Sequence, residues 1–338
     1  MQPAPSPRLL PVPVADPLAG LTLPRLRLGQ APTPVRKLDL GAGADLWVKD
    51  DGAFAAHGGN KARKLEWLLA EAQRRGARTV ITGGAIGTNH GLAVARYAAD
   101  LGMRAVLVLV PQPEDDHVRA QLAAIRETGA ELRFANGLVP GLAAGLRELA
   151  ARTVSDPARP FFMPPGGSTP RGCVGYVCAG LELGQQVRAG ELPEPERLIV
   201  AAGTGGTAAG LLLGMRLCGL RTRLVAVLVN DITPVTARSI SGLASRTAAL
   251  LRRHGGRVPA FALSAGDLDL DRRWLGGGYG HPTEEGAAAI ESLAGEGVGL
   301  EPVYTAKAAA AALALREEQG SGPLLYWQTY GSPPPQSR

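Results

Sequence analysis

Short apolar runs alternate with amphipathic segments along most of this chain, and that alternation is the strongest constraint on its fold. The run at 46–50 is typical of a buried strand, and the segment at 61–75 repeats apolar residues at helical spacing. Strands that are separated by helices of this kind form βαβ units and parallel sheets. The sequence therefore predicts an α/β protein with mainly parallel, twisted sheets flanked by helices.

The predicted elements extend from residue 46 to residue 328. Strands are expected at 46–50, 79–82, 105–110, 131–135, 198–201, 224–228 and 324–328. Helices are expected at 61–75, 90–101, 116–128, 141–152, 172–188, 207–217, 234–253, 283–296 and 306–319. Because one strand precedes a compact α/β block and several strands follow it, we expect one domain inserted into another. The larger, discontinuous domain is placed at 1–57 and 166–338, and the smaller, inserted domain at 58–165.

Composition excludes several classes of function. The net charge of +6 comes from basic residues that are scattered among acidic ones, so a nucleic-acid partner is not expected. Apolar stretches are too short to cross a membrane, and the Pro-rich start lacks the pattern of a secretory signal. The three cysteines, Cys173, Cys178 and Cys218, lack metal-binding spacing. They favour a reducing cytoplasm over a disulfide framework, and no metal site is expected.

A glycine-rich loop lies between the predicted strand at 198–201 and the predicted helix at 207–217. It reads Gly203, Thr204, Gly205, Gly206, Thr207. Glycines let the backbone approach a ligand closely, and amide groups at a helix N-terminus attract a phosphate. The loop therefore suits phosphate binding, although an ordinary glycine-rich turn is the alternative.

A second motif, Gly-Gly-Asn-Lys-Ala-Arg-Lys at 58–64, begins an amphipathic helix. Asn60 is expected to be the N-cap. Lys61 falls in the first helical turn, where the helix dipole disfavours a cation and lowers the pKa of an amine. An amine with a lowered pKa is a nucleophile toward an aldehyde. The alternative is that Lys61 and Lys64 lie on a solvated helix face.

A third motif, Gly-Gly-Ala-Ile-Gly-Thr-Asn-His at 83–90, again joins a strand to a helix. Thr88, Asn89 and His90 bring hydroxyl, amide and imidazole groups close to free backbone amides. This combination suits a carboxylate. The alternative is a glycine turn in which Thr88 or Asn89 caps the helix.

Together these motifs resemble the D-cysteine desulfhydrase and 1-aminocyclopropane-1-carboxylate deaminase family of pyridoxal-phosphate enzymes. The likeness covers about residues 33–330. Its markers are Gly-Gly-Asn-Lys-Ala-Arg-Lys-Leu-Glu (58–66), Thr-Asn-His (88–90), Gly-Gly-Ser (166–168), Gly-Thr-Gly-Gly-Thr (203–207), Gly-Tyr-Gly (278–280) and Pro-Val-Tyr-Thr-Ala-Lys (302–307). The resemblance implies fold type II, the tryptophan-synthase-β-like fold, with two domains and a homodimer.

The resemblance also implies how pyridoxal 5′-phosphate is held. Lys61 would carry the cofactor as a Schiff base, with Asn60 beside it. Lys64 and the glycine-rich loop would hold the phosphate. Asn89 would face the ring hydroxyl of the cofactor, and Thr305 its pyridine nitrogen.

A small amino acid would be the substrate. By resemblance, its carboxylate lies near Thr88, Asn89 and His90, while Tyr279 and Tyr304 lie over the reacting centre. Lys61, Thr88 and the two tyrosines would form the catalytic set. The alternative for each tyrosine is a packed core ring with a bonded hydroxyl.

The neutral hydroxyl of Thr305 favours α,β-elimination, which yields a 2-oxo acid and ammonia, because it makes a shallower electron sink than a carboxylate would. Ring opening, dehydration, racemisation and β-replacement remain alternatives, as does a catalytically silent cofactor-binding protein. The chain departs from the family pattern at Thr88, at 92–93 and at 328–330. We therefore expect a substrate other than free D-cysteine. Arg171 either pairs with an anionic substrate group or faces solvent, and the second is favoured.

Overall fold

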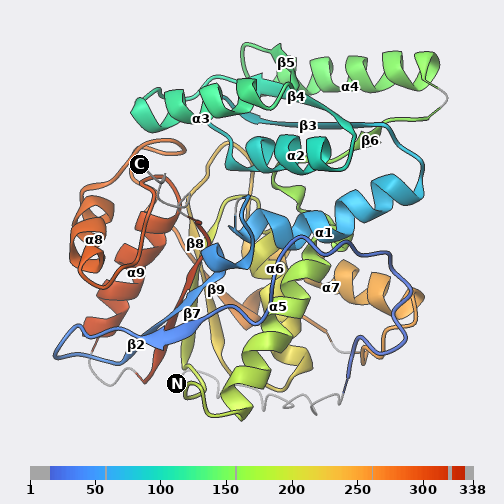
Figure 1. Cartoon of the computed structure of the whole chain (residues 1–338). Coiled ribbons are helices and arrows are strands. Elements are labelled where there is room, and N and C mark those ends of the chain that lie inside the picture. Colours follow the sequence, from blue (N-terminus) through green and yellow to red (C-terminus); the bar gives the residue numbers. More distant parts are fainter. Residues whose placement is uncertain (1–15, 58, 157, 261, 319–321, 332–338) are drawn as a thin grey trace, which may run out of the picture.

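The computed structural model describes residues 16–331 except for 58, 157, 261 and 319–321, and it contains two sheets (Figure 1). The larger sheet has six strands in the order β1-β2-β10-β7-β8-β9, and the smaller has four in the order β5-β4-β3-β6. Apart from the antiparallel β1–β2 pair, the neighbouring strands pair in parallel. The strands are β1 Val35–Lys37, β2 Leu46–Asp50, β3 Thr79–Ala85, β4 Arg104–Val110, β5 Glu131–Phe134, β6 Phe161–Phe162, β7 Arg197–Ala202, β8 Arg223–Leu228, β9 Leu268–Asp271 and β10 Leu324–Gln328.

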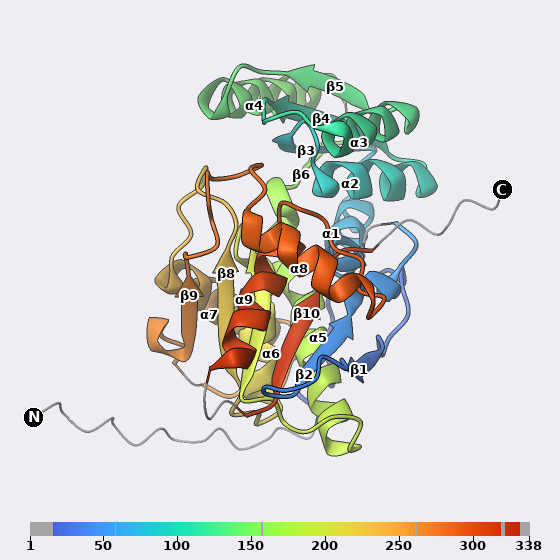
Figure 2. The same ribbon diagram turned by 90° about the vertical axis from the view of Figure 1, so that its left-hand side faces the viewer.

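Helices cover both sheets (Figure 2). The α-helices are α1 Gly59–Arg74, α2 Asn89–Asp100, α3 Asp116–Glu127, α4 Leu138–Ser155, α5 Pro170–Arg188, α6 Gly206–Leu217, α7 Ala237–Arg253, α8 Glu284–Ala294 and α9 Thr305–Glu317. Three short 3-10 helices, η1 Asp51–Phe54, η2 Pro165–Gly167 and η3 Ala265–Asp267, complete the described elements. No helix in the described part of the chain is long and apolar enough to span a membrane.

The larger sheet is buried on both faces, as parallel sheets require. One core lies between this sheet and helices α5, α6 and α7, and another lies between the sheet and helices α8 and α9. The central strand β10 is buried along its whole length, so its side chains are buried on both faces of the sheet and do not alternate between buried and exposed. Trp327 and Tyr176 are buried core rings.

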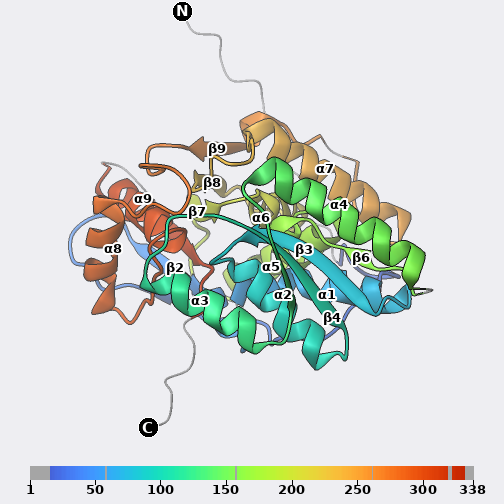
Figure 3. The same cartoon turned by 90° about the horizontal axis from the view of Figure 1, so that it is seen from above.

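The smaller sheet packs mainly on α1 and α2. In β4, Leu107 and Leu109 enter this core, while Val108 and Val110 lie on the opposite face, toward α4. Figures 1 and 3 show α4 and α2 on opposite sides of this sheet. α1 contributes to this core, and Trp67 on the same helix joins the core of the larger sheet.

The predicted strands and helices are all found, with shifted ends. α4 begins at Leu138, three residues before the predicted start, since a proline is tolerated in the first helical turn. The short edge strands β1 and β9 and the two-residue β6 were not predicted. The expected end of the last helix at residue 319 and the Pro-rich ends of the chain lie outside the described residues. The division into domains 1–57 with 166–338 and 58–165 stays a prediction, although the two sheets divide along similar lines.

Candidate active site

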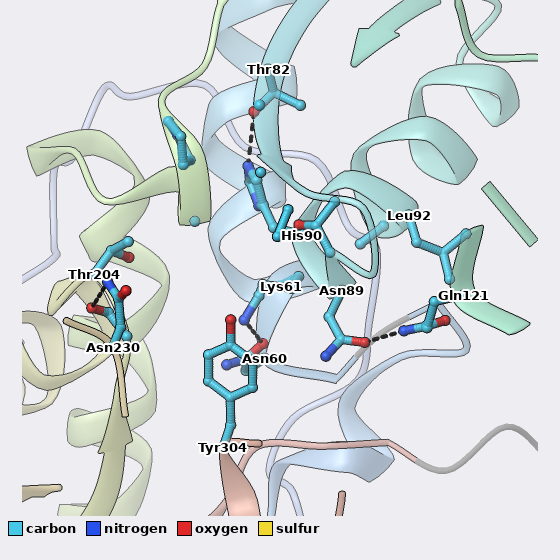
Figure 4. Close-up of a pocket in the computed structure, with 18 of the residues that line it drawn as sticks. Asn60, Lys61, Thr82, Asn89, His90, Leu92, Gln121, Thr204, Asn230 and Tyr304 are labelled. Carbon is cyan, nitrogen blue, oxygen red and sulfur yellow. Dashed lines mark hydrogen bonds between the residues drawn. The ribbon is translucent and has the colours of Figure 1, made fainter. Parts of the chain in front are cut away.

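A cavity of about 920 Å³ lies between the two sheets and contains the residues that the sequence singled out. Its lining includes the residues that follow the carboxyl ends of β7, β8 and β10, together with the end of β3 and the start of α2. In open parallel sheets, ligands bind at this end of the strands. The cavity is therefore the candidate active site, and Figure 4 shows it in close-up.

Lys61 points into this cavity from the first turn of α1 (Figure 4). Its Nζ donates a hydrogen bond to Asn60 Oδ1 over 2.8 Å. Burial, and to a lesser extent the Lys64 ammonium, lowers the Lys61 pKa from 10.5 to about 7, while Glu301 acts in the opposite direction. The lowered pKa was expected, but its largest cause is burial and not the helix dipole.

Asn60 is not the N-cap that the sequence predicts. α1 begins one residue earlier, at Gly59, whose φ of +34° favours glycine. Asn60 consequently lies inside the helix, where its side chain accepts from Lys61. Gly58, the first residue of the motif, lies outside the described residues.

A buried ionic network fixes the part of α1 that carries Lys61. Arg63, two residues further along, pairs with Asp51 at 2.7 Å and with Glu182 of α5 at 3.0 Å. Glu182 also pairs with Lys49 of β2 at 2.6 Å, and Tyr176 donates to Asp51 over 2.6 Å. These groups are almost fully buried, so their mutual pairing is needed to offset the loss of water. The network ties α1 to the larger sheet.

The glycine-rich loop leads into α6, and the hydroxyl groups of Ser168 and of Thr204 lie together at the start of this helix. Gly205, with a φ of +78°, is the N-cap of α6. Ser168 Oγ lies 2.6 Å from Thr204 Oγ1 and accepts from the Gly206 amide over 3.1 Å. A Cβ at Gly206 would lie only 2.4 Å from Ser168 Oγ, so glycine is required for this close approach. Thr207 and Gly203 line the same cavity.

Lys64 lies one helical turn after Lys61 and donates to the carbonyl of Gly166 over 3.1 Å. Burial lowers its pKa from 10.5 to about 8, and among the described residues it has no carboxylate within salt-bridge distance. An ammonium group, two hydroxyls and the amides at the start of α6 form the donor set that a phosphate requires. Together with the Lys61 amine, which can react with an aldehyde, they fit pyridoxal phosphate.

Thr88 is the N-cap of α2, and its Oγ1 accepts from the Gly91 amide over 3.1 Å. The capping alternative therefore holds for Thr88, and its hydroxyl hydrogen has no acceptor among the described residues, so it can donate to a ligand. Asn89 accepts a hydrogen bond from Gln121 of α3 (Figure 4). Both residues line the cavity at a helix N-terminus, which attracts a carboxylate. Gly83 and Gly84, expected in a turn, belong to β3 instead.

His90 is buried, and its ring points toward Thr82 of β3 (Figure 4). Its Nε2 lies 3.2 Å from Thr82 Oγ1, and Nδ1 has no partner among the described residues. Burial, with the nearby Lys61 and Lys64, holds the His90 pKa well below 6.5, so the ring is neutral at neutral pH. Contact of His90 with a substrate carboxylate stays a prediction.

Tyr279 and Tyr304 meet inside the cavity. Tyr304 donates its hydroxyl hydrogen to the Tyr279 hydroxyl over 2.8 Å. The backbone amide of Tyr279 donates to Asp231 over 3.0 Å. Lys307, which is fully buried, donates to the carbonyls of Leu275 and Gly278 at 2.7 and 3.3 Å. Lys307 therefore holds the loop that carries Tyr279.

Thr305 starts α9, and its hydroxyl is occupied by Glu301. It accepts from the Glu301 amide over 2.8 Å and lies 3.2 Å from the Glu301 carbonyl. The Glu301 carboxylate lines the cavity and accepts from the amides of Val303, Tyr304 and Thr305 at 3.0, 2.6 and 2.7 Å. Burial raises the Glu301 pKa. The contact of Thr305 with the cofactor stays a prediction.

Several lining residues were not found from the sequence. Polar examples are Gln121, Asn230 and Glu301. Asn230 donates to the carbonyl of Gly203 over 3.1 Å and so braces the glycine-rich loop. Its place just after a buried strand, where ligand-binding residues gather, was an available signal.

Arg171 lies away from the site and is mostly buried. It sits 3.5 Å from Glu71, near the end of α1, so neither expectation for it holds. The three cysteines are free, and no group of possible metal ligands occurs among the described residues.

Comparisons with known proteins agree with this geometry. Residues 26–327 match the family described as pyridoxal-phosphate dependent enzyme. The D-cysteine desulfhydrase of Klebsiella pneumoniae (strain 342) is 35% identical, over 94% of this chain and 97% of that protein. The D-cysteine desulfhydrase of Salmonella newport (strain SL254) is 34% identical with the same coverage. A crystal structure of an ACC deaminase homologue is 31% identical, with a TM-score of 0.79 over 94% of this chain and 95% of the other. An O-ureido-L-serine synthase, at 19% identity and a TM-score of 0.60, shares the fold.

Proposed function

This chain belongs to the pyridoxal-phosphate-dependent enzyme family, and we propose that it catalyses α,β-elimination from a small amino acid, giving a 2-oxo acid and ammonia. The observation that carries the proposal is the Lys61 amine, whose pKa is about 7 and which shares one cavity with a phosphate-binding donor set and a tyrosine pair. The similarity to two D-cysteine desulfhydrases supports elimination over the other reactions of the fold.

Different residues of the cavity would bind the cofactor and the substrate. Lys64, Ser168, Thr204 and the α6 amides would hold the cofactor phosphate, and Lys61 would hold its aldehyde carbon. Thr88 and the α2 amides would bind the substrate carboxylate. Holding both anionic groups fixes the substrate relative to the cofactor, and orientation of this kind contributes several kcal/mol to catalysis, on the order of 7 or more in favourable cases.

The same residues can move the protons. When bound, the cofactor supplies an electron sink that stabilises negative charge at the α-carbon. Because burial lowers the Lys61 pKa to about 7, this amine, when not bonded to the cofactor, can lose its proton near neutral pH and accept the α-proton. Burial raises the Tyr279 pKa, which keeps its hydroxyl protonated. Because this hydroxyl accepts from Tyr304, its own hydrogen can point to the substrate. We assign that hydrogen to the departing β-substituent.

We also propose a homodimer in the cytoplasm, made of a larger domain (1–57 and 166–338) and an inserted domain (58–165). The family resemblance supports the dimer. The free cysteines, two of them buried, suit a reducing compartment. The separate four-stranded sheet supports the inserted domain.

The test is a panel of D- and L-amino acids, including cysteine and 1-aminocyclopropane-1-carboxylate, with release of 2-oxo acid and ammonia as the measurement. We expect elimination from β-substituted substrates. Lys61→Ala should abolish both the release and the cofactor adduct that borohydride fixes to the protein. Lys37→Ala, which removes an exposed lysine, is the matched control and should change neither. An unchanged adduct in Lys61→Ala would refute the assignment.

A further inference from the structure

We propose that the active-site cavity has an apolar arm that receives the β-substituent of the substrate, so that in the preferred substrates the leaving atom on the β-carbon, such as sulfur, carries an alkyl or aryl group. This inference rests on the proposed function and names its substrate class. The arm is made by Leu138, Leu142 and Leu146 of α4 on one side and by Phe162 and Ile232 on the other.

The geometry of α4 directs its leucines toward the cavity. Gly141 and Gly145 are the buried residues of this helix, and they lie against β4. A Cβ at Gly141 would lie 2.9 Å from Val110, which shows how closely the helix approaches the strand. Leu138, Leu142 and Leu146 recur every four residues and so form one stripe beside these glycines. That stripe lines the cavity.

The apolar exposure of the molecule is concentrated on this arm. Eight large hydrophobic side chains are exposed among the described residues, and the five arm residues make up most of them. Leu142 is 60% exposed and Leu146 is 58% exposed. A contiguous apolar surface of this kind marks a binding site for an apolar group. No charged side chain occurs among the five.

The arm and the reacting centre are parts of one cavity. The group that fills the arm is therefore expected to belong to the substrate. Lys61, Tyr279 and the arm residues line one cavity of about 920 Å³. That volume, which also has to hold the cofactor, is near the upper end of the range for ligand pockets, about 300–1,000 Å³. A three-carbon amino acid would leave the arm empty, whereas an apolar β-substituent would fill it and gain the free energy of leaving water.

S-benzylcysteine is a suitable probe because its benzyl group can enter the arm. Its elimination breaks the bond between the β-carbon and sulfur and the bond between the α-carbon and hydrogen. Water then replaces the amino group. The balance is S-benzylcysteine plus water giving pyruvate, ammonia and phenylmethanethiol, with no oxidant or reductant.

The experiment compares kcat/KM for S-benzylcysteine and for cysteine, each as both enantiomers, using the holoenzyme. We expect S-benzylcysteine to be preferred. Leu142→Gln should lower the ratio of the two kcat/KM values about tenfold, as expected when a buried apolar contact is lost. Val139→Gln is the matched control, since Val139 is exposed on the same helix but does not line the cavity. It should leave the ratio unchanged.

Calorimetric binding of S-benzyl-α-methylcysteine, which has no α-proton to lose, adds a readout that needs no turnover. We expect Leu142→Gln, and not Val139→Gln, to weaken it about tenfold. The arm is refuted if cysteine reacts and S-benzylcysteine does not, or if the two variants behave alike. It is also refuted if Leu142→Gln changes the mass of the assembly in sedimentation, because a second copy would then cover the stripe. If neither amino acid yields pyruvate, the proposed function fails, and the binding measurement still decides the arm.

Discussion

Replacing Lys61 by methionine is predicted to stabilise the cofactor-free protein at neutral pH. The folded protein lowers the Lys61 pKa from 10.5 to about 7, chiefly through burial. The unfolded chain recovers the ordinary pKa, so between these two pH values it binds more protons than the folded chain. Stability therefore rises with pH through this window, and the lysine destabilises the fold most at pH 7 and below.

The difference between 10.5 and 7 corresponds to roughly 5 kcal/mol below pH 7 and to about 4 kcal/mol at pH 7. Lys61 keeps some contact with the cavity, whose water offsets part of this cost. We therefore expect Lys61→Met to raise the free energy of unfolding by about 2–4 kcal/mol at pH 7 and by less than about 1 kcal/mol at pH 10.

Urea denaturation of both proteins at pH 7 and pH 10 measures this difference. Lys37→Met is the matched control, because Lys37 is exposed and pairs with Asp45 at the surface. That control should change stability by less than about 1 kcal/mol. If Lys61→Met changed stability equally at the two pH values, the lysine would be an ordinary ammonium and the reasoning would be wrong.

Three further predictions concern the surroundings of this lysine. Arg63→Met leaves Asp51 and Glu182 buried without that partner, so urea denaturation should show a loss of about 3–5 kcal/mol; a loss below about 1 kcal/mol would contradict the network. Lys307→Met frees the tyrosine loop and should lower kcat about tenfold while the cofactor absorbance is retained; Lys307→Arg should restore part of kcat, and an unchanged kcat would speak against a positioning role. His90 should stay neutral at pH 6 in nitrogen-15 NMR spectra, because burial lowers its pKa, and a protonated ring there would show that the pocket is wetter than the structure indicates.

Much of the fold could be predicted from the sequence because the central strands and helices carry their own patterns. The strand β10 is buried throughout, and four of its five residues are hydrophobic or aromatic, since a central parallel strand is covered on both faces. The strands β1 and β9 were missed because they lie at the edges of the sheet and are short. Their pairing is decided by neighbours that are distant in the sequence.

The candidate site likewise combines residues that a local motif identifies with residues that only the folded chain brings together. Lys61 and the loop at 203–207 were found because each concentrates its chemistry in one turn at a helix start. Glu301 was missed because it acts through amides of a helix that begins four residues later, and only the folded turn brings them together. Ser168 belongs to a recognised motif, but its contact with Thr204 joins residues that are 36 positions apart.

The buried network at Arg63 has a consequence for how substrate preference can change. It secures the amine-bearing helix to the larger sheet, whereas α2 and α4, which carry the altered positions 92–93 and the leucine stripe, take no part in it. The helix that carries Lys61 is therefore anchored through contacts that do not involve the leucine stripe of α4. Substitutions in this stripe can accumulate without displacing the Lys61 nitrogen, so new specificities can arise within one scaffold.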